Sequence, residues 1–422
     1  MQTCAERSEF EVIVVGAGPA GLMAALAVNT IGVDLALLSA AQDARQLAAD
    51  TRTTALFGGS IEMLRHIGAW THLEPLCAPL TGLRIVDDTG ALLRAPETLF
   101  RSSELGLPYF GYNVANVDLT RVLSDCALSR AAQIKRIGGS LTGLSFDDET
   151  VIAEIDHEKR ALRASLVVGA DGRGSVCRRD AGIATRTRQY PQAALATRFG
   201  HARPHQDVST EFHRRAGPLT TVPLPGARSS VVWVDTPAEI DRLAALRDEE
   251  FARALEDRLQ GLLGSVSSVD RRAKFPLAAV TAETMGRRRV ALVGEAAHVL
   301  PPIGAQGLNL GFRDAAWLAE ILPGAKARGT DLGASEVLEA YDEARRTDVS
   351  TRTMAVDLLN RSLTADLLPF DLARGAGIVG LNALPWLRRL VMREGIQPTN
   401  IELPRLLKPS AADGPRTPNA AA

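Results

Sequence analysis

The sequence predicts an α/β fold with a Rossmann-like core, an inserted mixed or antiparallel β-sheet and C-terminal helices. Three observations predict it. A β-branched run at residues 10–15 leads into a glycine-rich turn and an apolar helix. Residues 208–234 form alternating segments broken at two Gly/Pro pairs, and strand and helix patterns return after residue 289. Because a sheet-forming segment separates two groups of α/β elements, we expect one domain to be inserted into another.

The composition excludes several classes of protein. Lys and Arg number 48 against 49 for Asp and Glu, so no overall field favours binding to nucleic acid or acidic lipid. The 422 residues suffice for two interlocked domains with a substantial core. The cysteines form no C-x-x-C pair and the histidines show no ligand spacing, which predicts reduced thiols and no metal site.

The apolar stretch at residues 10–28 could be mistaken for a signal or membrane segment. Glycines and a proline interrupt it, and it lacks a cationic leader and a small-residue cleavage site. No other stretch reaches a charge-free length that could span a bilayer. We therefore expect a soluble, cytoplasmic protein.

The remaining elements follow from periodicity and turn signals. The opening is a strand at 10–15, a helix at Leu22–Asn29 and a strand at Val33–Leu38, the β-turn-α-β order of a dinucleotide fold. Further strands are expected at 83–86, 91–93 (a hairpin with 83–86), 165–169 and 289–293. Helices are expected at 60–68, 117–130, 238–263, 310–321, 336–360 and about 366–392.

The first chemical motif is Gly16-Ala17-Gly18-Pro19-Ala20-Gly21, between the first strand and the first helix. Glycines here permit a tight turn and a close approach of backbone to pyrophosphate, and the helix N-terminus offers N–H groups to phosphate. A glycine-rich turn without ligand is the alternative. The second strand ends in Ser39 rather than an acidic residue, so Ser39 is the candidate for the ribose, with Asp43 a weaker one.

The second motif is a buried strand that runs into Asp171-Gly172 and is followed by Ser175 and Arg178. Such a turn could place the carboxylate of Asp171 beside a bound cofactor. An ordinary strand-end turn is the alternative, because Asp-Gly is common in turns.

The third motif delivers a carboxylate, Glu295, after Gly294 at the end of a strand, where α/β folds bind ligands. A loop rich in Pro and Gly then opens a helix near Asn309. Its backbone N–H groups and helix dipole suit a group that becomes anionic, such as the pyrimidine edge of a reduced flavin. The loop residues singled out are Pro302, Gly304, Gln306, Gly307, Leu308 and Asn309.

Together the three motifs resemble the group A flavoprotein monooxygenases, and within them the flavin hydroxylases of ubiquinone biosynthesis. The resemblance covers residues 10–395, nearly the whole chain. Other matching stretches are Arg52–Ser60, Gly111–Asn116, Gly217–Leu224, Phe275–Leu277, Gly311–Asp314 and residues 340–361.

The resemblance implies roles in binding FAD. Gly16, Gly18 and Gly21, with Pro19 and Ala20, would cradle the pyrophosphate. Arg52 and Asn116 would contact the middle of the cofactor, and Asp171 would touch FAD and the nicotinamide donor. Glu295 stands where the family usually has Asp, bonding the ribitol hydroxyls, and the loop from Gly304 to Asn309 would supply amides to the flavin.

The resemblance also implies a mechanism. NAD(P)H or another donor reduces FAD, O2 forms a C4a-hydroperoxyflavin, and an oxygen atom is transferred to the ring of a polyprenyl phenol or quinone precursor. No catalytic side chain is required, and we interpret His298, Tyr112 and Tyr190 as structural. The alternatives are another phenolic substrate, a non-oxygenating flavin reductase, or a flavin-holding accessory protein of a biosynthetic complex.

The predicted domains alternate along the chain. The FAD-binding domain is predicted to consist of residues 1–80, 113–187 and 276–360. The substrate domain is predicted to consist of residues 81–112 and 188–275. C-terminal helices follow at 361–403, and a disordered tail at 404–422. The substrate pocket is expected between the flavin and the inserted sheet, including residues 221–223 and 231–234. Residues 378–392, with Trp386, either lie at a membrane surface, giving peripheral association with the inner membrane, or form a core helix. No nucleic-acid partner is expected.

Overall fold

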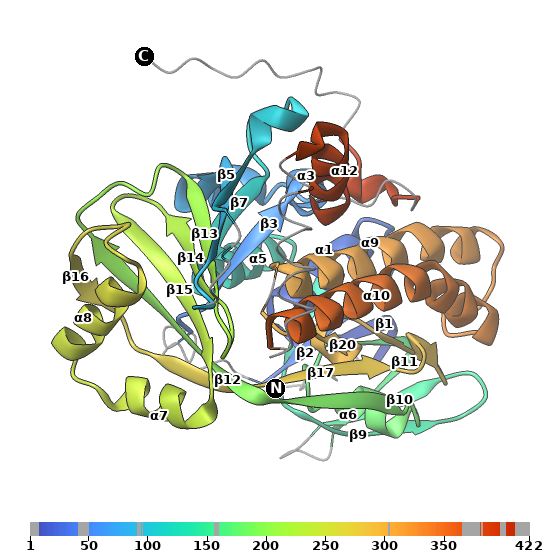
Figure 1. The fold of residues 1–422 in the computed structure, drawn as a ribbon. Helices are drawn as coiled ribbons and strands as arrows, with labels where there is room; N and C mark the ends of the chain where they lie inside the picture. The colour runs from blue at the N-terminus through green and yellow to red at the C-terminus, as the bar shows by residue number, and fades with distance from the viewer. Residues whose placement is uncertain are drawn as a thin grey trace.

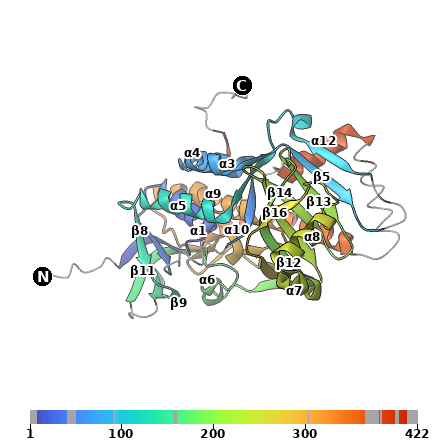
Figure 2. The same cartoon turned by 90° about the vertical axis from the view of Figure 1, so that its left-hand side faces the viewer.

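The computed structural model describes residues 8–40, 50–90, 94, 96–155, 160–302, 304–364, 380, 383–396 and 402–409. Two sheets and the helices beside them make up most of this part of the chain. In Figure 1 one sheet, with α9 and α10 beside it, lies to the right, and the other, with α7 and α8, lies to the left. Figure 2 shows the same arrangement from the side.

The first sheet carries the three motifs at one edge. Its path runs β18-β19-β11-β1-β2-β8, and β9 and β10 extend it through β11. The strands from β19 to β8 run parallel, and the centre of β1 is fully buried, as a sheet covered on both faces requires. These strands are β1 (Glu9–Val15), β2 (Leu35–Ser39), β8 (Ile134–Gly138), β9 (Leu141–Phe146), β10 (Val151–Ile155), β11 (Arg160–Gly169), β18 (Gly286–Arg287) and β19 (Val290–Leu292).

Helices cover this sheet. The helix α1 (Pro19–Asn29) packs against α5 (Asn116–Leu128) and α9 (Gln306–Ala327), and α9 packs against α10 (Ser335–Thr364). Every residue of α1 from Gly21 to Val28 is buried, because α1 lies between the sheet and its helical neighbours. The short helix α6 (Val176–Asp180) follows β11.

The second sheet is mixed, with one parallel pair, β5 with β13, among the described residues. Its path is β20-β17-β12-β15-β14-β13-β5-β6, with β16 beside β12. One face is covered by α7 (Pro237–Ala245) and α8 (Asp248–Arg258), which bury Trp233 and Phe251. The strands are β5 (Gly82–Asp87), β6 (Thr98–Arg101), β12 (Thr185–His201), β13 (Val208–His213), β14 (Leu219–Leu224), β15 (Arg228–Asp235), β16 (Val266–Val269), β17 (Ala273–Ala282) and β20 (His298–Val299).

A small sheet of β3 (Thr53–Phe57), β7 (Gly111–Ala115) and β4 (Ala78–Leu80) lies between the two larger ones. Asn113 of β7 is fully buried and donates to the carbonyl of Pro223 at 2.8 Å, which ties this sheet to β14. Around it lie α3 (Gly58–His66), α4 (Trp70–Leu73) and the 3-10 turns η1 (Glu74–Leu76) and η2 (Ser102–Leu105).

The predicted helix at 238–263 is wrong, because the chain forms two helices there. Leu246 and Arg247 are extended, with ψ of 151° and 157°. The carboxylate of Glu250 accepts a hydrogen bond from the Arg247 N–H at 3.1 Å and caps α8. The acidic triplet at 248–250, at the positive end of a helix dipole, was the sequence signal for this second start.

Other boundaries also differ from prediction. The helices α1 and α9 begin three to four residues earlier than expected, at Pro19 and Gln306. The strand β5 pairs with β6, and the expected partner at 91–93 lies outside the described residues. In the expected helix at 366–392, residues 366–379 lie outside the described part, and the helix that is described, α12, spans Pro385–Ile396.

The first part of the tail predicted to be disordered forms a 3-10 turn, η4 (Arg405–Leu407), and residues 410–422 lie outside the described part. Leu406 and Leu407 are buried, and η4 contacts α3 and α9. Arg405 N–H also donates to Glu320 of α9 at 2.9 Å. The two adjacent leucines explain why this part of the Pro-rich segment is ordered, because their apolar side chains are removed from water by packing against the protein.

The predicted domain boundaries stay predictions. Three of them, at residues 112, 187 and 275, fall inside β7, β12 and β17, strands that continue across the proposed junctions. Among the described helices, none combines the length and the apolar character needed to cross a bilayer.

Candidate flavin site

A cavity of about 370 Å³ lies where the first and second sheets meet. It is open to the carboxyl ends of the parallel strands, the expected place for a ligand in an α/β fold. Most of the residues predicted to contact the cofactor line it: Gly18, Pro19, Ala20, Gly21, Arg52, Asn116, Gly294, Glu295, Pro302, Gln306, Gly307 and Leu308.

The strand ends explain why distant motifs converge here. The N–H of Gly16 donates to Leu38 O at 2.8 Å, and that of Ala170 to Val15 O at 2.9 Å. The N–H of Val293 donates to Gly169 O at 2.9 Å. The residues that follow β1, β11 and β19 are thus held side by side by backbone hydrogen bonds, and the three motifs share one edge of the sheet.

The turn after β1 is built from glycines with different surroundings. A Cβ on Gly16 would lie 2.3 Å from Ala170 O, and one on Gly21 would lie 2.0 Å from Gly16 O. A Cβ on Gly18 would meet nothing within 4 Å. Gly16 and Gly21 therefore allow close packing of the turn, while Gly18 faces open space in the cavity, where a phosphate can approach the backbone.

The loop before α9 presents a second helix N-terminus to the same cavity. Ala305, at the N-cap position, has a φ of 51°, and no side chain of the described residues caps the helix. A Cβ on Gly307 would meet nothing within 4 Å. The first N–H groups of α9 are therefore available to an anionic ligand atom.

The side-chain amide of Asn309 anchors the start of α9 with four hydrogen bonds. Its Oδ1 accepts from the Phe57 N–H at 3.0 Å and from the Ser60 hydroxyl at 2.7 Å. Its Nδ2 donates to Ala55 O and Ala305 O, each at 2.8 Å. Asn309 is 1% exposed and does not line the cavity, so its side chain ties α9 to β3 and α3.

The turn after β19 is held by the buried carboxylate of Asp314 on α9. Its Oδ2 accepts from the Gly294 N–H at 3.0 Å and from Nε2 of His298 at 2.7 Å, and its Oδ1 accepts from Arg345 at 2.7 Å. Burial alone would raise the pKa of Asp314, but His298 and Arg345 outweigh it and lower the pKa. The adjacent Glu295 is exposed toward the cavity.

His298 has the hydrogen-bonding role expected of it. Its side chain is fully buried, and because the ionised Asp314 can only accept, Nε2 carries the proton. Its Nδ1 is buried and has no hydrogen-bond partner in the described part of the chain. Nε2 is thus committed to Asp314, while His298 also lines the cavity, so its assignment as a structural residue rather than a base stays a prediction.

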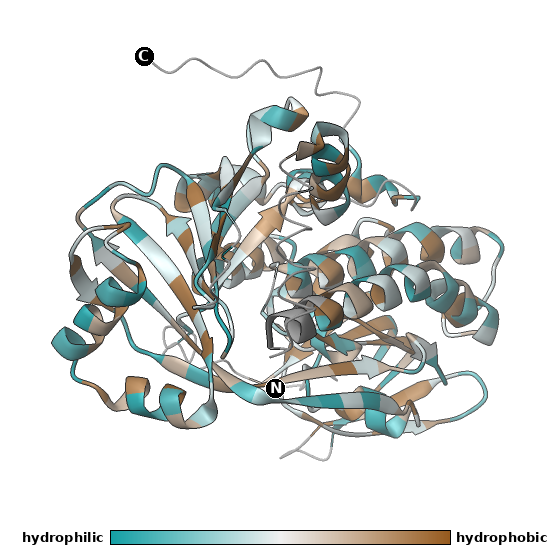
Figure 3. Ribbon diagram, viewed as in Figure 1, coloured by the Kyte–Doolittle hydropathy of each residue, from teal (hydrophilic) through white to brown (hydrophobic). Residues whose placement is uncertain are grey.

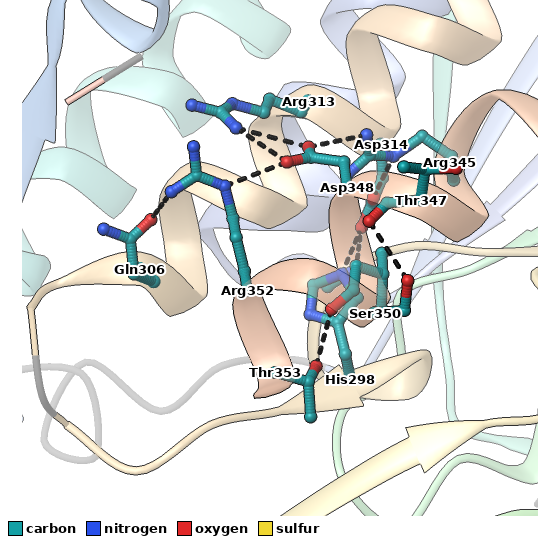
Figure 4. A network of polar contacts seen from close by, with 12 residues as sticks. His298, Gln306, Arg313, Asp314, Arg345, Thr347, Asp348, Ser350, Arg352 and Thr353 are labelled. Carbon is teal, nitrogen blue, oxygen red and sulfur yellow. Dashed lines mark hydrogen bonds and ion pairs between the residues drawn. The ribbon is translucent and has the colours of Figure 1, made fainter. Parts of the chain in front are cut away.

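A network of buried ion pairs extends from Asp314 to the flavin loop (Figure 4). Arg345 bonds Asp348 at 2.9 Å, and Asp348 also pairs with Arg313 at 3.0 Å and Arg352 at 2.9 Å. Burial opposes the charge on Asp348, but the three guanidinium groups hold its pKa well below the usual value. Burial lowers the pKa of Arg313 to about 10, which still leaves it charged at neutral pH.

The network ends at Gln306, in the first turn of α9. Arg352 donates to the Oε1 of Gln306. The Nε2 of Gln306 donates to Gly304 O at 3.0 Å and to Gly395 O at 3.3 Å. Gln306 therefore connects the flavin loop to α10 and to the end of α12.

In the middle of the site, Arg52 forms an ion pair with Asp50. Arg52 donates to Asp50 through its Nε at 2.9 Å and its Nη2 at 2.8 Å. Burial alone would raise the pKa of Asp50, but the bonds from Arg52 lower it. Glu295 adds a second negative charge near Arg52. Asn116, at the start of α5, accepts from the Thr54 hydroxyl at 2.7 Å and completes this wall.

Asp171 does not line the cavity, although its neighbours Ala170 and Gly172 do. Its Oδ1 accepts from the Ser175 hydroxyl at 2.6 Å and its Oδ2 from the Cys177 N–H at 3.0 Å. The carboxylate thus stabilises the start of α6. Its contact with FAD and the nicotinamide donor stays a prediction.

The remaining predicted residues lie away from the cavity. Gly16, Gly304 and Ser39 do not line it, and Asp43 lies outside the described residues. Tyr112 packs edge-on against Trp70, and Tyr190 donates to Asp357 at 2.7 Å. Neither tyrosine lines the cavity, in agreement with a structural role.

The sequence did not identify most of the wall opposite the flavin loop. It is formed by apolar residues and by the hydroxyls of Thr53 and Ser230, which lie 2.7 Å apart. The expected segment 231–234 contributes Val231 and Val232, whereas residues 221–223 do not line the cavity. Other residues of this wall are Thr51, Ala196 and Phe275, while Val299, Leu300 and Pro301 line the cavity from the segment that leads into the flavin loop.

These features fit FAD. Gly18 leaves room for a phosphate beside the N-terminus of α1, Glu295 offers a carboxylate to hydroxyl groups, and the start of α9 offers uncapped N–H groups. One ligand that carries a pyrophosphate, a polyol and an anionic ring edge satisfies all three.

Comparison with known proteins agrees with this arrangement. The FAD binding domain family matches residues 9–356. Ubiquinone hydroxylase UbiL of Rhodospirillum rubrum is 34% identical over 94% of this chain and 92% of its own. The 3-demethoxyubiquinol 3-hydroxylase of Escherichia coli is 28% identical over 91% of this chain and 97% of its own.

Solved structures share the fold. The p-nitrophenol 4-monooxygenase PnpA of Pseudomonas putida superposes with a TM-score of 0.75 at 20% identity, over 93% of this chain and 100% of its own. At this identity the likeness shows the α/β architecture and nothing finer. With the family match over most of the chain, it follows that the chain belongs to the FAD binding domain family and is an FAD-dependent monooxygenase of the ubiquinone hydroxylase group.

Proposed function

We propose that this enzyme hydroxylates the aromatic ring of a polyprenyl phenol or quinone precursor of ubiquinone. One observation carries the proposal: a single cavity joins the phosphate turn, the Glu295 carboxylate and the start of α9 to an apolar wall on the second sheet. A flavin ring held at the α9 end would have an apolar chamber on its open side. The names of the relatives supply the substrate class.

We assign the predicted cofactor contacts on this basis. The turn around Gly18 binds the pyrophosphate, Glu295 the ribitol, and the N–H groups at the start of α9 the pyrimidine edge. Glu295 is one methylene longer than the family's Asp. Because its side chain is exposed to the cavity, it has room to adopt a conformation that reaches the ribitol.

When bound, FAD reduced by NAD(P)H or another donor supplies oxygen chemistry, using O2 to hydroxylate an electron-rich ring. The chain's own residues bind, orient and exclude water. Val231, Val232 and Phe275 keep the chamber apolar, which disfavours water near the reacting atoms. We assign the Thr53–Ser230 hydroxyl pair, which lies in the cavity wall, to a hydrogen bond with an oxygen on the substrate ring. No catalytic side chain is assigned.

Two measurements test the proposal. Purified enzyme is incubated with a short-chain prenyl phenol, reductant and ¹⁸O₂, and the product is analysed by mass spectrometry. We expect one labelled oxygen in the product. Peroxide without labelled product would instead indicate a non-oxygenating reductase. In a deletion strain, the quinone intermediate that accumulates should lack one ring hydroxyl, and a normal ubiquinone profile would contradict the assignment to this pathway.

The same strain addresses the accessory-protein alternative. A Ser230→Leu variant narrows the chamber while leaving the flavin contacts untouched, so it should retain FAD and fail to restore ubiquinone. If this variant restores ubiquinone fully, the chamber is not the substrate site.

We also propose a cytoplasmic location with peripheral association at the inner membrane or with a biosynthetic complex. The support is chemical: a polyprenyl substrate resides in the bilayer, and the enzyme must reach it. Fractionation of cells should place part of the protein with membranes that release it at high salt.

A further inference from the structure

One face of α12 exposes large apolar side chains to solvent. Trp386 is 64% exposed, Leu390 47% and Val391 46%, and Leu384, just before the helix, is 42% exposed. Trp386 and Leu390 are one helical turn apart and therefore share a face. Exposed apolar groups gathered on one helix mark an interaction surface rather than ordinary surface scatter. We call Leu384, Trp386, Leu390 and Val391 the α12 apolar face.

The opposite side of α12 is firmly attached to the protein. Met392 is buried, and Arg388 pairs with Glu104 of η2 at 2.6 Å. The Arg388 guanidinium also lies over the Phe100 ring, 4.3 Å from its centre, and donates to the carbonyl of Leu99. The apolar face is therefore presented outward by a helix that is already anchored.

The charges on α12 complement an anionic surface. Arg389 and Arg393 are exposed and one turn apart, on the flank of the Trp386–Leu390 row. Arg388 pairs with Glu104, and Glu394 is half-buried with a contact of its own, so the exposed charges of this helix that can meet an external surface are Arg389 and Arg393. Trp and Leu on one face with Arg at its border is the composition of a helix that lies in a bilayer interface.

The helix also ends beside the flavin site. The carbonyl of Gly395 accepts from Gln306, which lines the cavity and is held by Arg352. Figure 3 shows α12 with mixed hydrophobic and hydrophilic residues at the top of the molecule, away from α7 and α8. A surface that binds α12 would therefore lie close to the flavin loop.

We propose that the α12 apolar face docks on an anionic phospholipid bilayer and brings the cavity to a membrane-borne substrate. The inference rests on the proposed function for the lipid nature of the substrate. The docking itself rests on the exposed Trp and Leu residues and on the two exposed arginines, Arg389 and Arg393. A second copy of the chain is the competing occupant, and the test separates the two.

The experiment is co-sedimentation of the FAD-loaded, full-length protein with vesicles. One set contains phosphatidylcholine alone, and the other equal parts of phosphatidylcholine and phosphatidylglycerol. We expect binding to the anionic set that weakens with added salt. The double variant Trp386→Ser/Leu390→Ser should reduce partitioning roughly tenfold or more. Arg389→Glu/Arg393→Glu should abolish the preference for phosphatidylglycerol.

Leu128→Ser is the matched control, because Leu128 is 50% exposed at the end of α5 and should not affect vesicle binding. All variants should retain flavin absorbance and turn over a soluble short-chain substrate like wild type. Wild-type protein that stays in the supernatant, or α12 variants that sediment as wild type does, would overturn the docking. Conversion of a dimer to a monomer by the α12 variants, without change in vesicle binding, would assign the face to self-association. Vesicle binding without turnover of any polyprenyl phenol would instead count against the proposed function.

Discussion

At the residue scale, the glycines of the turn after β1 are required for different physical reasons. Gly16 has a φ of +108° and lies against the backbone of Ala170, so a side chain there collides with the fold. Gly18 has open space where its Cβ would be, so a side chain there competes only with a ligand. The two positions therefore separate damage to the fold from loss of the cofactor.

Gly18→Glu should reduce bound FAD by at least roughly tenfold, because a carboxylate would occupy the phosphate position. The unfolding midpoint of the FAD-free protein should not change. Gly16→Ala should lower the stability by about 2 kcal/mol or more. Flavin absorbance after purification and urea unfolding measure the two effects. Full FAD occupancy in Gly18→Glu would show that the turn does not bind the pyrophosphate.

Glu295 permits a second test of the cofactor assignment. Glu295→Asp restores the carboxylate length usual in the family and should keep FAD affinity. Glu295→Ala removes the hydrogen-bond acceptor and should weaken binding roughly tenfold. Fluorescence titration of the FAD-free protein gives the dissociation constants. Equal affinity in all three proteins would exclude a ribitol contact.

At the element scale, the start of α9 depends on contacts to strands and helices remote in sequence. Asn309 makes four hydrogen bonds to β3, α3 and the preceding loop, all from a buried side chain. This fixes the first turn of α9 against the cavity. The position of the flavin loop is thus set by β3, some 250 residues earlier in the chain.

Asn309→Ala should destabilise the protein by about 3 kcal/mol, because it leaves several buried polar groups without partners. It should also weaken FAD binding, since the helix start loses its anchor. Gln306→Ala, in the same turn but with a half-buried side chain and two of its three hydrogen bonds at the surface, should change the free energy of unfolding by only about 1 kcal/mol. Urea unfolding of the FAD-free proteins checks both values, and equal losses would mean that Asn309 is not the anchor.

Elements defined by local signals were predictable, and those defined by remote contacts were not. The strand β1 and helix α1 follow from adjacent residues, and so does the turn between them. The break between α7 and α8 had a local signal, the three acidic residues 248–250. It was missed because apolar residues recur with helical spacing on both sides of it. The chamber wall depends on which strands pair: Ala196 meets Val232 through the β12–β15 register, which no local pattern encodes. Ser39 and Asp171 were predicted as contacts because each follows or ends a strand of the first sheet, yet neither lines the cavity.

At the scale of the whole molecule, buried charges connect the first sheet to the C-terminal helices. Asp314 and Asp348 lie between three arginines and His298, and both have a lowered pKa. A carboxyl group whose pKa is lower in the folded protein than in the unfolded chain stabilises the folded protein. The stabilisation is complete when the pH lies above the pKa of the unfolded chain, which is about 4 for Asp. It is lost as the pH falls toward the folded-state pKa.

The free energy of unfolding should therefore decline as the pH is lowered from about 5 to about 3. Asp348→Asn should be less stable at pH 7 by about 3–5 kcal/mol, because it leaves buried arginines unpaired. Its stability should decline less steeply with acid, since one titrating group is gone. Thermal unfolding across this pH range checks both slopes. Parallel curves for the two proteins would show that Asp348 does not control the acid transition.

The strand order β19-β11-β1-β2 sets the timing of assembly during protein synthesis. The turn around Gly18 leaves the ribosome before its partners at β19 and the start of α9, which follow roughly 270–290 residues later. At about 5–20 residues per second, that interval lasts roughly 15–60 s. FAD can be captured in its full site only after this interval, so until then the nascent chain must keep its exposed parallel strand edges from aggregating without help from the cofactor.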